Sequence, residues 1–141
     1  MPINVEPLLF DTSAALAFVD TDSPFHQPVW DLASQCSRGL CGHASFEFLS
    51  VLTRLPMPKR LHGADALLLM RHEFPANRFL PSDVMDDLIT EFAQLGIVGG
   101  MVYDGLVGAC ARHHRLTLIS CDRRVEDTYR LLVAPYQLIV A

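Results

Sequence analysis

Short apolar runs that are typical of buried strands alternate with longer helical stretches along this chain. The strand-like runs are VEPLLF (residues 5–10), LTLIS (116–120) and YQLIV (136–140), with shorter candidates at GLCG (39–42) and NRFLPS (77–82). Strands that are separated by helices are joined by crossover connections, which align neighbouring strands in parallel. The sequence therefore predicts an α/β domain of three layers, α/β/α, with a central, mainly parallel sheet.

Helices are predicted between these runs, at residues 12–19, 23–35, 43–55, 64–74, 82–96 and 99–114. The 82–96 segment has the clearest boundaries, because Ser82 can cap its start, Asp83 suits the positive first turn and Gly96 can end it. Residues at helical spacing predict which face of this helix is buried: Val84, Leu88, Phe92 and Leu95.

Length and composition indicate one domain. The chain has 141 residues, of which 50% are hydrophobic, enough for one buried core but not for a second. No apolar run reaches the roughly 18 residues of a membrane-spanning helix, and the opening MPINVEP lacks the features of a secretory signal. We therefore expect a single soluble domain over residues 1–141, cytoplasmic and without a membrane partner. The net charge of −5 argues against binding nucleic acid by charge alone.

Four carboxylates occupy positions where an acid is unusual. Asp11 directly follows the first predicted strand and Asp122 lies just beyond LTLIS, so both are expected at the sheet edge where parallel sheets bind ligands. Glu47 and Asp104 interrupt apolar helical stretches, SFEFLSVL and MVYDGLVGA. An isolated buried carboxylate is costly unless it is paired or bound to a metal ion. Together, the four acids predict a common site.

A divalent cation relieves the repulsion among converging carboxylates, and hard oxygen ligands favour Mg²⁺ or Mn²⁺ over Zn²⁺. Such a site suits the hydrolysis of a phosphodiester bond. Each acid taken alone is better explained by a helix cap or an ion pair with arginine, so only their joint placement indicates a metal site. Phosphatases of the haloacid-dehalogenase type also place Asp after a strand, but they need a second acid where this chain has Ser13.

Four stretches resemble a PIN domain, and specifically the VapC-type toxins of bacterial toxin–antitoxin pairs: LLFDTSAALAFV (8–19), ASFEFLSVLTRL (44–55), GMVYDGLVGACARHHRLTLIS (100–120) and SCDRR (120–124). The order and spacing of the four acids are the most specific part of the resemblance. It implies a PIN-like three-layer fold and a Mg²⁺- or Mn²⁺-dependent endoribonuclease. It also implies a homodimer and a VapB-type antitoxin whose tail blocks the active site.

The resemblance also implies roles for individual residues. Four acids match the metal-binding, catalytic positions of the family one by one: Asp11, Glu47, Asp104 and Asp122. Two hydroxyl residues match supporting positions in the first and last motifs: Ser13 and Ser120. Three basic residues are expected to contact phosphate: Arg54, Arg123 and Arg124. Arg54 follows Glu47 by seven residues, which on one continuous helix places both on the same face.

Several alternatives stay open. All four acids are present, which favours an enzyme over a non-catalytic PIN-fold binding or regulatory module, while a solitary PIN nuclease without an antitoxin fits the same residues. The basic run RHHR, Arg112 to Arg115, is either a rim that faces RNA or the solvated end of a helix. Phe25 and Trp30 are more consistent with packing than with stacking a base.

Overall fold

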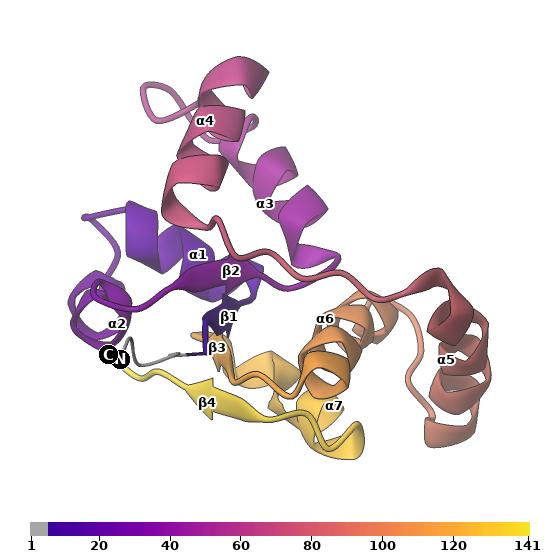
Figure 1. Cartoon of the computed structure of the whole chain (residues 1–141). Coiled ribbons are helices and arrows are strands. Elements are labelled where there is room, and N and C mark those ends of the chain that lie inside the picture. The colour runs from indigo at the N-terminus through magenta and orange to yellow at the C-terminus, as the bar shows by residue number, and fades with distance from the viewer. Residues whose placement is uncertain (1–5) are drawn as a thin grey trace, which may run out of the picture.

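A parallel sheet of four strands runs through the centre of the molecule in the order β2-β1-β3-β4 (Figure 1). The computed structural model describes residues 6–141, and its strands are β1 (Leu8–Phe10), β2 (Arg38–Leu40), β3 (Leu118–Ser120) and β4 (Tyr136–Leu138). All three pairings between neighbouring strands are parallel. Val5, where the first strand was expected to begin, lies outside the described residues with the rest of MPINV.

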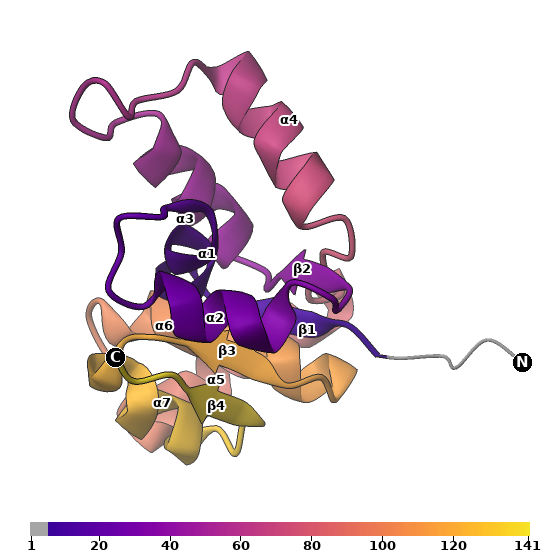
Figure 2. The ribbon, with the colours of Figure 1, turned by 90° about the vertical axis from the view of Figure 1, so that its left-hand side faces the viewer.

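Helices cover both faces of the sheet (Figures 1 and 2). One side carries α1 (Thr12–Val19), α2 (His26–Ala33), α3 (Ala44–Leu52) and α4 (Gly63–Glu73). The opposite side carries α6 (Met101–His114), and α5 (Ser82–Leu95) packs against it. The short 3-10 helix η1 (Arg123–Val125) and α7 (Glu126–Leu131), which come after β3 in the chain, lie on this side too. The predicted three-layer α/β/α class is therefore confirmed.

The two faces of the sheet contribute to separate hydrophobic cores, because successive strand residues point to opposite sides. Phe10 and Ile119 are fully buried in a core with α1 to α4, and Phe10 makes edge-to-face contacts with the rings of Phe18 and Phe74. Leu9 and Leu118 are fully buried on the other face, among residues of α6 and α7. Strands that are apolar on both faces explain the continuous hydrophobic runs of the sequence.

Two predicted helices are shorter than expected. The 23–35 helix begins only at His26, since the Ser23 hydroxyl accepts a hydrogen bond from the backbone N–H of Phe25 and holds a turn there. The 43–55 helix ends at Leu52, where the Thr53 hydroxyl donates to the carbonyl of Leu49 at 2.9 Å. The clearest predicted helix is confirmed, with Gly96 as its left-handed C-cap, although Pro81 takes the N-cap position expected for Ser82.

The strand predicted at 77–82 is wrong. The segment makes an isolated bridge between Cys41 and Arg78, and the Asn77 side chain accepts the hydrogen bond of the Leu40 N–H at 2.7 Å. The backbone passes so close to β2 that a β-carbon on Gly39 would lie 2.0 Å from the carbonyl oxygen of Ala76. The side chain of Asn77 thus accepts a hydrogen bond from β2 that a backbone carbonyl would accept in a regular strand.

Two further expectations need correction. Leu95 was expected in the buried stripe of α5, but it lies near the end of the helix and is exposed, whereas Leu88 and Phe92 are buried. The helix α7 was not predicted, because its six residues EDTYRL are mostly polar and too few to show helical periodicity. Among residues 6–141, no helix has both the length and the apolar character to cross a membrane.

Candidate active site

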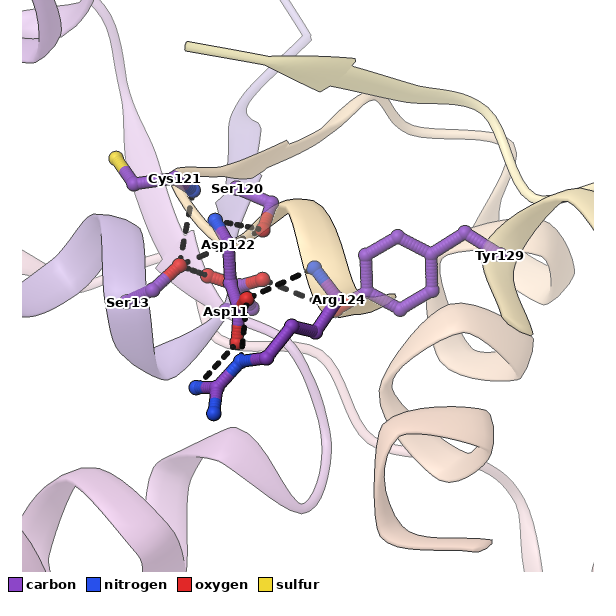
Figure 3. Close-up of polar contacts among 7 residues, drawn as sticks. All are labelled: Asp11, Ser13, Ser120, Cys121, Asp122, Arg124 and Tyr129. Atoms are coloured by element: carbon purple, nitrogen blue, oxygen red, sulfur yellow. Dashed lines mark hydrogen bonds and ion pairs between the residues drawn. The ribbon is translucent and has the colours of Figure 1, made fainter. Parts of the chain in front are cut away.

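Asp11 lies where β1 passes into α1 and is the N-cap of that helix (Figure 3). Its Oδ1 accepts hydrogen bonds from the backbone N–H of Ala14 at 3.0 Å and from the hydroxyl of Ser13 at 2.6 Å. Its Oδ2 accepts one from the phenol of Tyr129 at 3.0 Å. The residue is only 5% exposed. Burial raises the pKa of this carboxyl, and the surrounding hydrogen bonds oppose that rise.

Hydroxyl groups join the ends of the two central strands. The Ser13 hydroxyl accepts a hydrogen bond from the backbone N–H of Cys121 at 2.9 Å and lies 3.4 Å from the hydroxyl of Ser120. Ser120 is fully buried, and its hydroxyl accepts a hydrogen bond from the backbone N–H of Asp122 at 3.2 Å. Ser13 therefore contacts its acid directly, whereas Ser120 orients the backbone from which Asp122 projects.

Asp122 forms an ion pair with Arg124 through both of its oxygens (Figure 3). Nε of Arg124 donates to Oδ1 at 3.0 Å and a terminal guanidinium nitrogen donates to Oδ2 at 3.1 Å. The same Oδ1 caps η1 by accepting the backbone N–H of Arg124 at 2.9 Å. Hydrogen bonding to Arg124 lowers the pKa of Asp122. Because the Arg124 side chain is 91% exposed, solvent screens this pair and the arginine can leave it at little cost.

Asp104 and Glu47 approach the site from two helices. Asp104 lies in the first turn of α6 and Glu47 in the first turn of α3. Burial, followed by the charges of Glu47, Asp11 and Asp122, raises the pKa of Asp104 to about 6. Each of the other three predicted acids is therefore near enough to repel Asp104. Asp11, Asp104 and Asp122 line one hollow, and we call these three carboxylates together with Glu47 the acidic cluster.

A small hollow opens among three of these acids. It is lined by Asp11, Thr12, Ser13, Asp104, Val107, Asp122, Val125 and Tyr129, and Glu47 stands outside it. Within residues 6–141, no three His, Cys, Asp or Glu side chains stand close enough together to hold a metal ion as they are now arranged. The bonds from Ser13 and Tyr129 to Asp11, and from Arg124 to Asp122, occupy oxygens that a cation would use.

The other basic residues that the sequence suggested for RNA contact lie outside the hollow. Arg54 lies beyond the end of α3, so the expectation that it shares a helix face with Glu47 is wrong. Arg54 and Arg123 are both exposed. Arg112 is held by Glu91 at 2.7 Å and by the carbonyl of Leu132 at 3.0 Å, so the first residue of RHHR belongs to a partly exposed ion pair with α5.

Phe25 and Trp30 belong to the packing of α2. The ring of Trp30 stacks on Phe18 at 5.1 Å, and Phe25 packs against the core formed with α1 to α4. A separate apolar hollow of about 700 Å³ lies between α5 and α6, lined by residues that include Met85, Ile89 and Val98. It contains none of the four acids of the cluster.

Tyr129 was not identified from the sequence as a residue of the site. It lies on α7, is 1% exposed, and reaches Asp11 from a position 118 residues further along the chain. Its phenol has a strongly raised pKa, because the group is buried and faces the Asp11 carboxylate. A tyrosine that follows EDT gives no local sign of this contact, which depends on the unpredicted helix α7.

Two solved structures have folds similar to that of this chain. The chain aligns with a chain of the VapBC2 complex from Rickettsia felis, bound to a DNA fragment from its promoter, with a TM-score of 0.65 and 13% identity over 94% of this chain and 98% of that one. It also aligns with FitAcB from Neisseria gonorrhoeae, with a TM-score of 0.61 and 17% identity over 92% and 95% of the two chains. At these identities the likeness concerns the fold.

Sequence relatives are closer. The chain is 41% identical over 123 residues to ribonuclease VapC27 of Mycobacterium tuberculosis, covering 87% of this chain and 90% of the relative. It is 32% identical over 102 residues to ribonuclease VapC40 of the same species, covering 71% and 75%. The PIN domain family matches residues 8–131, a span that holds all four acids and Tyr129. Because this match spans most of its length, the chain belongs to the PIN domain family.

Proposed function

We propose that this protein is a divalent-metal-dependent endoribonuclease and the toxin of a toxin–antitoxin pair. The observation that carries the proposal is the placement of Asp11 and Asp122 just beyond the adjacent strands β1 and β3, in a hollow that Asp104 also lines. The ribonuclease relatives, at 41% and 32% identity, supply the reaction class. The single-domain organisation over residues 1–141 is part of the same proposal.

The donor set fits a hard divalent cation, since the cluster supplies carboxylate oxygens that repel one another. Asp11, Glu47 and Asp104 would hold it directly or through water, and Mg²⁺ or Mn²⁺ is the ion we propose. When bound, the cation supplies charge stabilisation at the phosphate and a more acidic attacking water. Asp122 becomes available to the cluster only after Arg124 has released both of its oxygens.

The residues around the cluster have distinct tasks in this proposal. Ser13 and Tyr129 hold the two oxygens of Asp11 in a fixed orientation before substrate arrives. Asp122 then helps to orient the attacking water. Arg124, once released, is free to contact a phosphate oxygen of the RNA, a role in which an arginine offers two parallel hydrogen bonds. Arg123 and Arg54 are further candidates for phosphate contact, and both are exposed.

A VapB-type antitoxin is the proposed protein partner, supported by the likeness of the fold to the VapBC2 and FitAcB structures. Homodimerisation belongs to the proposal as an expectation from the family resemblance. Action on cellular RNA agrees with a cytoplasmic location, which we also propose. The alternative of a solitary nuclease predicts that no neighbouring gene encodes an antitoxin.

The test is RNA cleavage by the purified, antitoxin-free protein with Mg²⁺ or Mn²⁺. Asp11→Ala and Asp104→Ala are expected to lose cleavage by a factor of about 100 or more. Asp65→Asn, an exposed acid on α4, is the matched control and is expected to retain full activity. Equal cleavage by wild type and both alanine variants would contradict the assignment of the site. RNA binding without cleavage by the wild type would favour the non-catalytic module.

A further inference from the structure

An exposed aromatic ring lies next to an acid of the cluster, because Tyr103 directly precedes Asp104 in the chain. The described residues with large exposed hydrophobic side chains include four aromatic ones: Trp30, Phe46, Phe79 and Tyr103. Tyr103 is 55% exposed and its ring stacks on the imidazole of His43, with centroids 5.0 Å apart and planes inclined by 22°. Phe46 is 66% exposed and makes an edge-to-face contact with Phe79. Trp30 lies apart, on α2.

The stacked pair connects the same two helices as two of the acids. Tyr103 directly precedes Asp104 in the first turn of α6, and His43 is the N-cap of α3, one helical turn before Glu47. The start of α3 packs closely on α6, since a β-carbon on Gly42 would lie 3.3 Å from that of Cys110. The pair of His43 and Tyr103 therefore lies alongside the pair of Glu47 and Asp104.

We propose that Tyr103, supported from behind by His43, is a stacking site for an unpaired RNA base that adjoins the cleaved phosphate. The inference rests on the proposed ribonuclease function and specifies how that site binds its substrate. The imidazole of His43 covers one face of the Tyr103 ring, and the residue is about half exposed. The other face of the ring is therefore available to a ligand. Protein recognition of single-stranded RNA commonly depends on such rings, because every base has a flat face that stacks.

Charge favours stacking as the source of affinity here. The chain carries a net charge of −5, and the acids of the site repel an RNA backbone. Arg124, the arginine in direct contact with one of these acids, can offer its positive charge to the RNA only after it leaves Asp122. Stacking on Tyr103 gains affinity without a positive charge and holds the base next to the acids. We expect little preference between bases at this position, since stacking discriminates weakly among them.

The test measures binding of a short single-stranded RNA with 2-aminopurine at one position in turn, in Ca²⁺ to limit cleavage and with the RNA checked for integrity. In the wild type, one position is expected to show fluorescence quenched by stacking. Tyr103→Ala is expected to abolish that quenching and to weaken binding by about 5- to 150-fold, the range of one base–aromatic contact. Tyr103→Phe keeps the ring and is expected to bind within about twofold of wild type.

Controls separate stacking from general damage. Leu68→Ala removes a 69% exposed apolar side chain on α4 and is expected to change neither quenching nor affinity. An RNA that is abasic at the quenched position is expected to bind the wild type as weakly as the intact RNA binds Tyr103→Ala. If Tyr103→Ala is folded and binds the intact RNA as tightly as the wild type does, the stacking site is overturned.

Other outcomes distinguish this inference from the function on which it rests. Wild-type protein that cleaves RNA, while Tyr103→Ala keeps full RNA affinity but loses antitoxin, assigns the ring to the protein partner and overturns the stacking site alone. Wild-type protein that shows quenching but no cleavage with Mg²⁺ or Mn²⁺ supports the stacking site and overturns the nuclease. Protein that binds no RNA overturns both.

Discussion

Asp11 is held in one orientation by hydrogen bonds from its neighbours. A buried carboxylate with donors on both oxygens keeps one orientation, and Tyr129 provides the donor to Oδ2. We predict that Tyr129→Phe lowers the free energy of unfolding by about 1–3 kcal/mol, because Oδ2 loses its partner in a buried position. Cleavage should fall as well. Urea denaturation and RNA cleavage measure the two effects.

Tyr136→Phe is the matched control for that change. Its hydroxyl also donates to a carboxylate, that of Glu126 at 3.3 Å, but it lies outside the acidic cluster. Activity is expected to remain at the wild-type level in this variant. If both tyrosine variants lose cleavage equally, the hydroxyl of Tyr129 has no special role in ordering Asp11.

Asp104 makes stability depend on pH. Its pKa rises from 3.8 to about 6 on folding, because of burial and the neighbouring acids. Because the folded protein binds the proton of Asp104 more tightly than the unfolded chain does, protonation of Asp104 stabilises the fold. This stabilisation is complete below about pH 3.8 and is lost as the pH rises through about 6. In chelator, Asp104→Asn should therefore be more stable than the wild type at pH 7, by about 1–2 kcal/mol after solvent screening. Parallel stability curves between pH 3.5 and 7.5 would refute this.

At the level of residues, sequence reasoning finds the acids but only some of their partners. Asp11 and Asp122 are visible because each follows an apolar strand, and Asp104 because it interrupts an apolar helix. Ser13 contacts Asp11, as the family resemblance implied. The contact of Tyr129 with Asp11 could not be predicted, since two residues 118 positions apart share no local sequence pattern. The pairing of Arg124 with Asp122 depends on the turn geometry of η1.

Among the helices, α5 and α6 pack through a glycine beside the active site. A β-carbon on Gly105 would lie 2.9 Å from two ring atoms of Phe92, which is buried between the helices. We predict that Gly105→Ala lowers the free energy of unfolding by about 1–3 kcal/mol through overpacking. It should also reduce cleavage, because Asp104 is its neighbour in the chain. Thermal denaturation and RNA cleavage measure these effects.

Gly63→Ala tests whether the effect comes from crowding. Gly63 begins α4, and a β-carbon added there would meet open space, with no neighbouring atom within 4 Å. Alanine at this position is expected to leave stability unchanged or to raise it by up to about 1 kcal/mol, as its helix propensity is higher. Equal destabilisation at both positions would show that packing against Phe92 is not the cause.

Elements with strong local signals were predicted well, and those that depend on tertiary contacts were not. The helices α1 and α5 form at their predicted positions, although Pro81 and not Ser82 is the N-cap of α5. The segment 77–82 looks like a strand by composition, but Asn77 bonds to β2 through its side chain. The helix α7 is stabilised by the burial of Thr128 and Tyr129 against the core. Its six mostly polar residues give no sequence pattern from which this burial could be predicted.

For the whole molecule, the parallel sheet is what turns four scattered acids into one site. Asp11 and Asp122 are 111 positions apart in the chain, yet they follow β1 and β3, which are adjacent strands. Crossover helices then bring Glu47 and Asp104 over the same edge. The repulsion that results is stored in the folded state, and it is relieved by any cation that binds there. Folding stability and cation binding are therefore coupled across the molecule.

This coupling predicts that Mn²⁺ or Mg²⁺ stabilises the folded protein even without RNA. At a concentration about 100 times its dissociation constant, a cation that binds only the folded state adds about 2.7 kcal/mol. For a domain of this size that corresponds to a rise in Tm of about 5–15 °C. Asp11→Asn and Asp104→Asn should lose most of the rise, and Asp65→Asn should keep it. An equal rise in all four proteins would indicate that the cation binds elsewhere, and the acidic cluster would then not be the metal site.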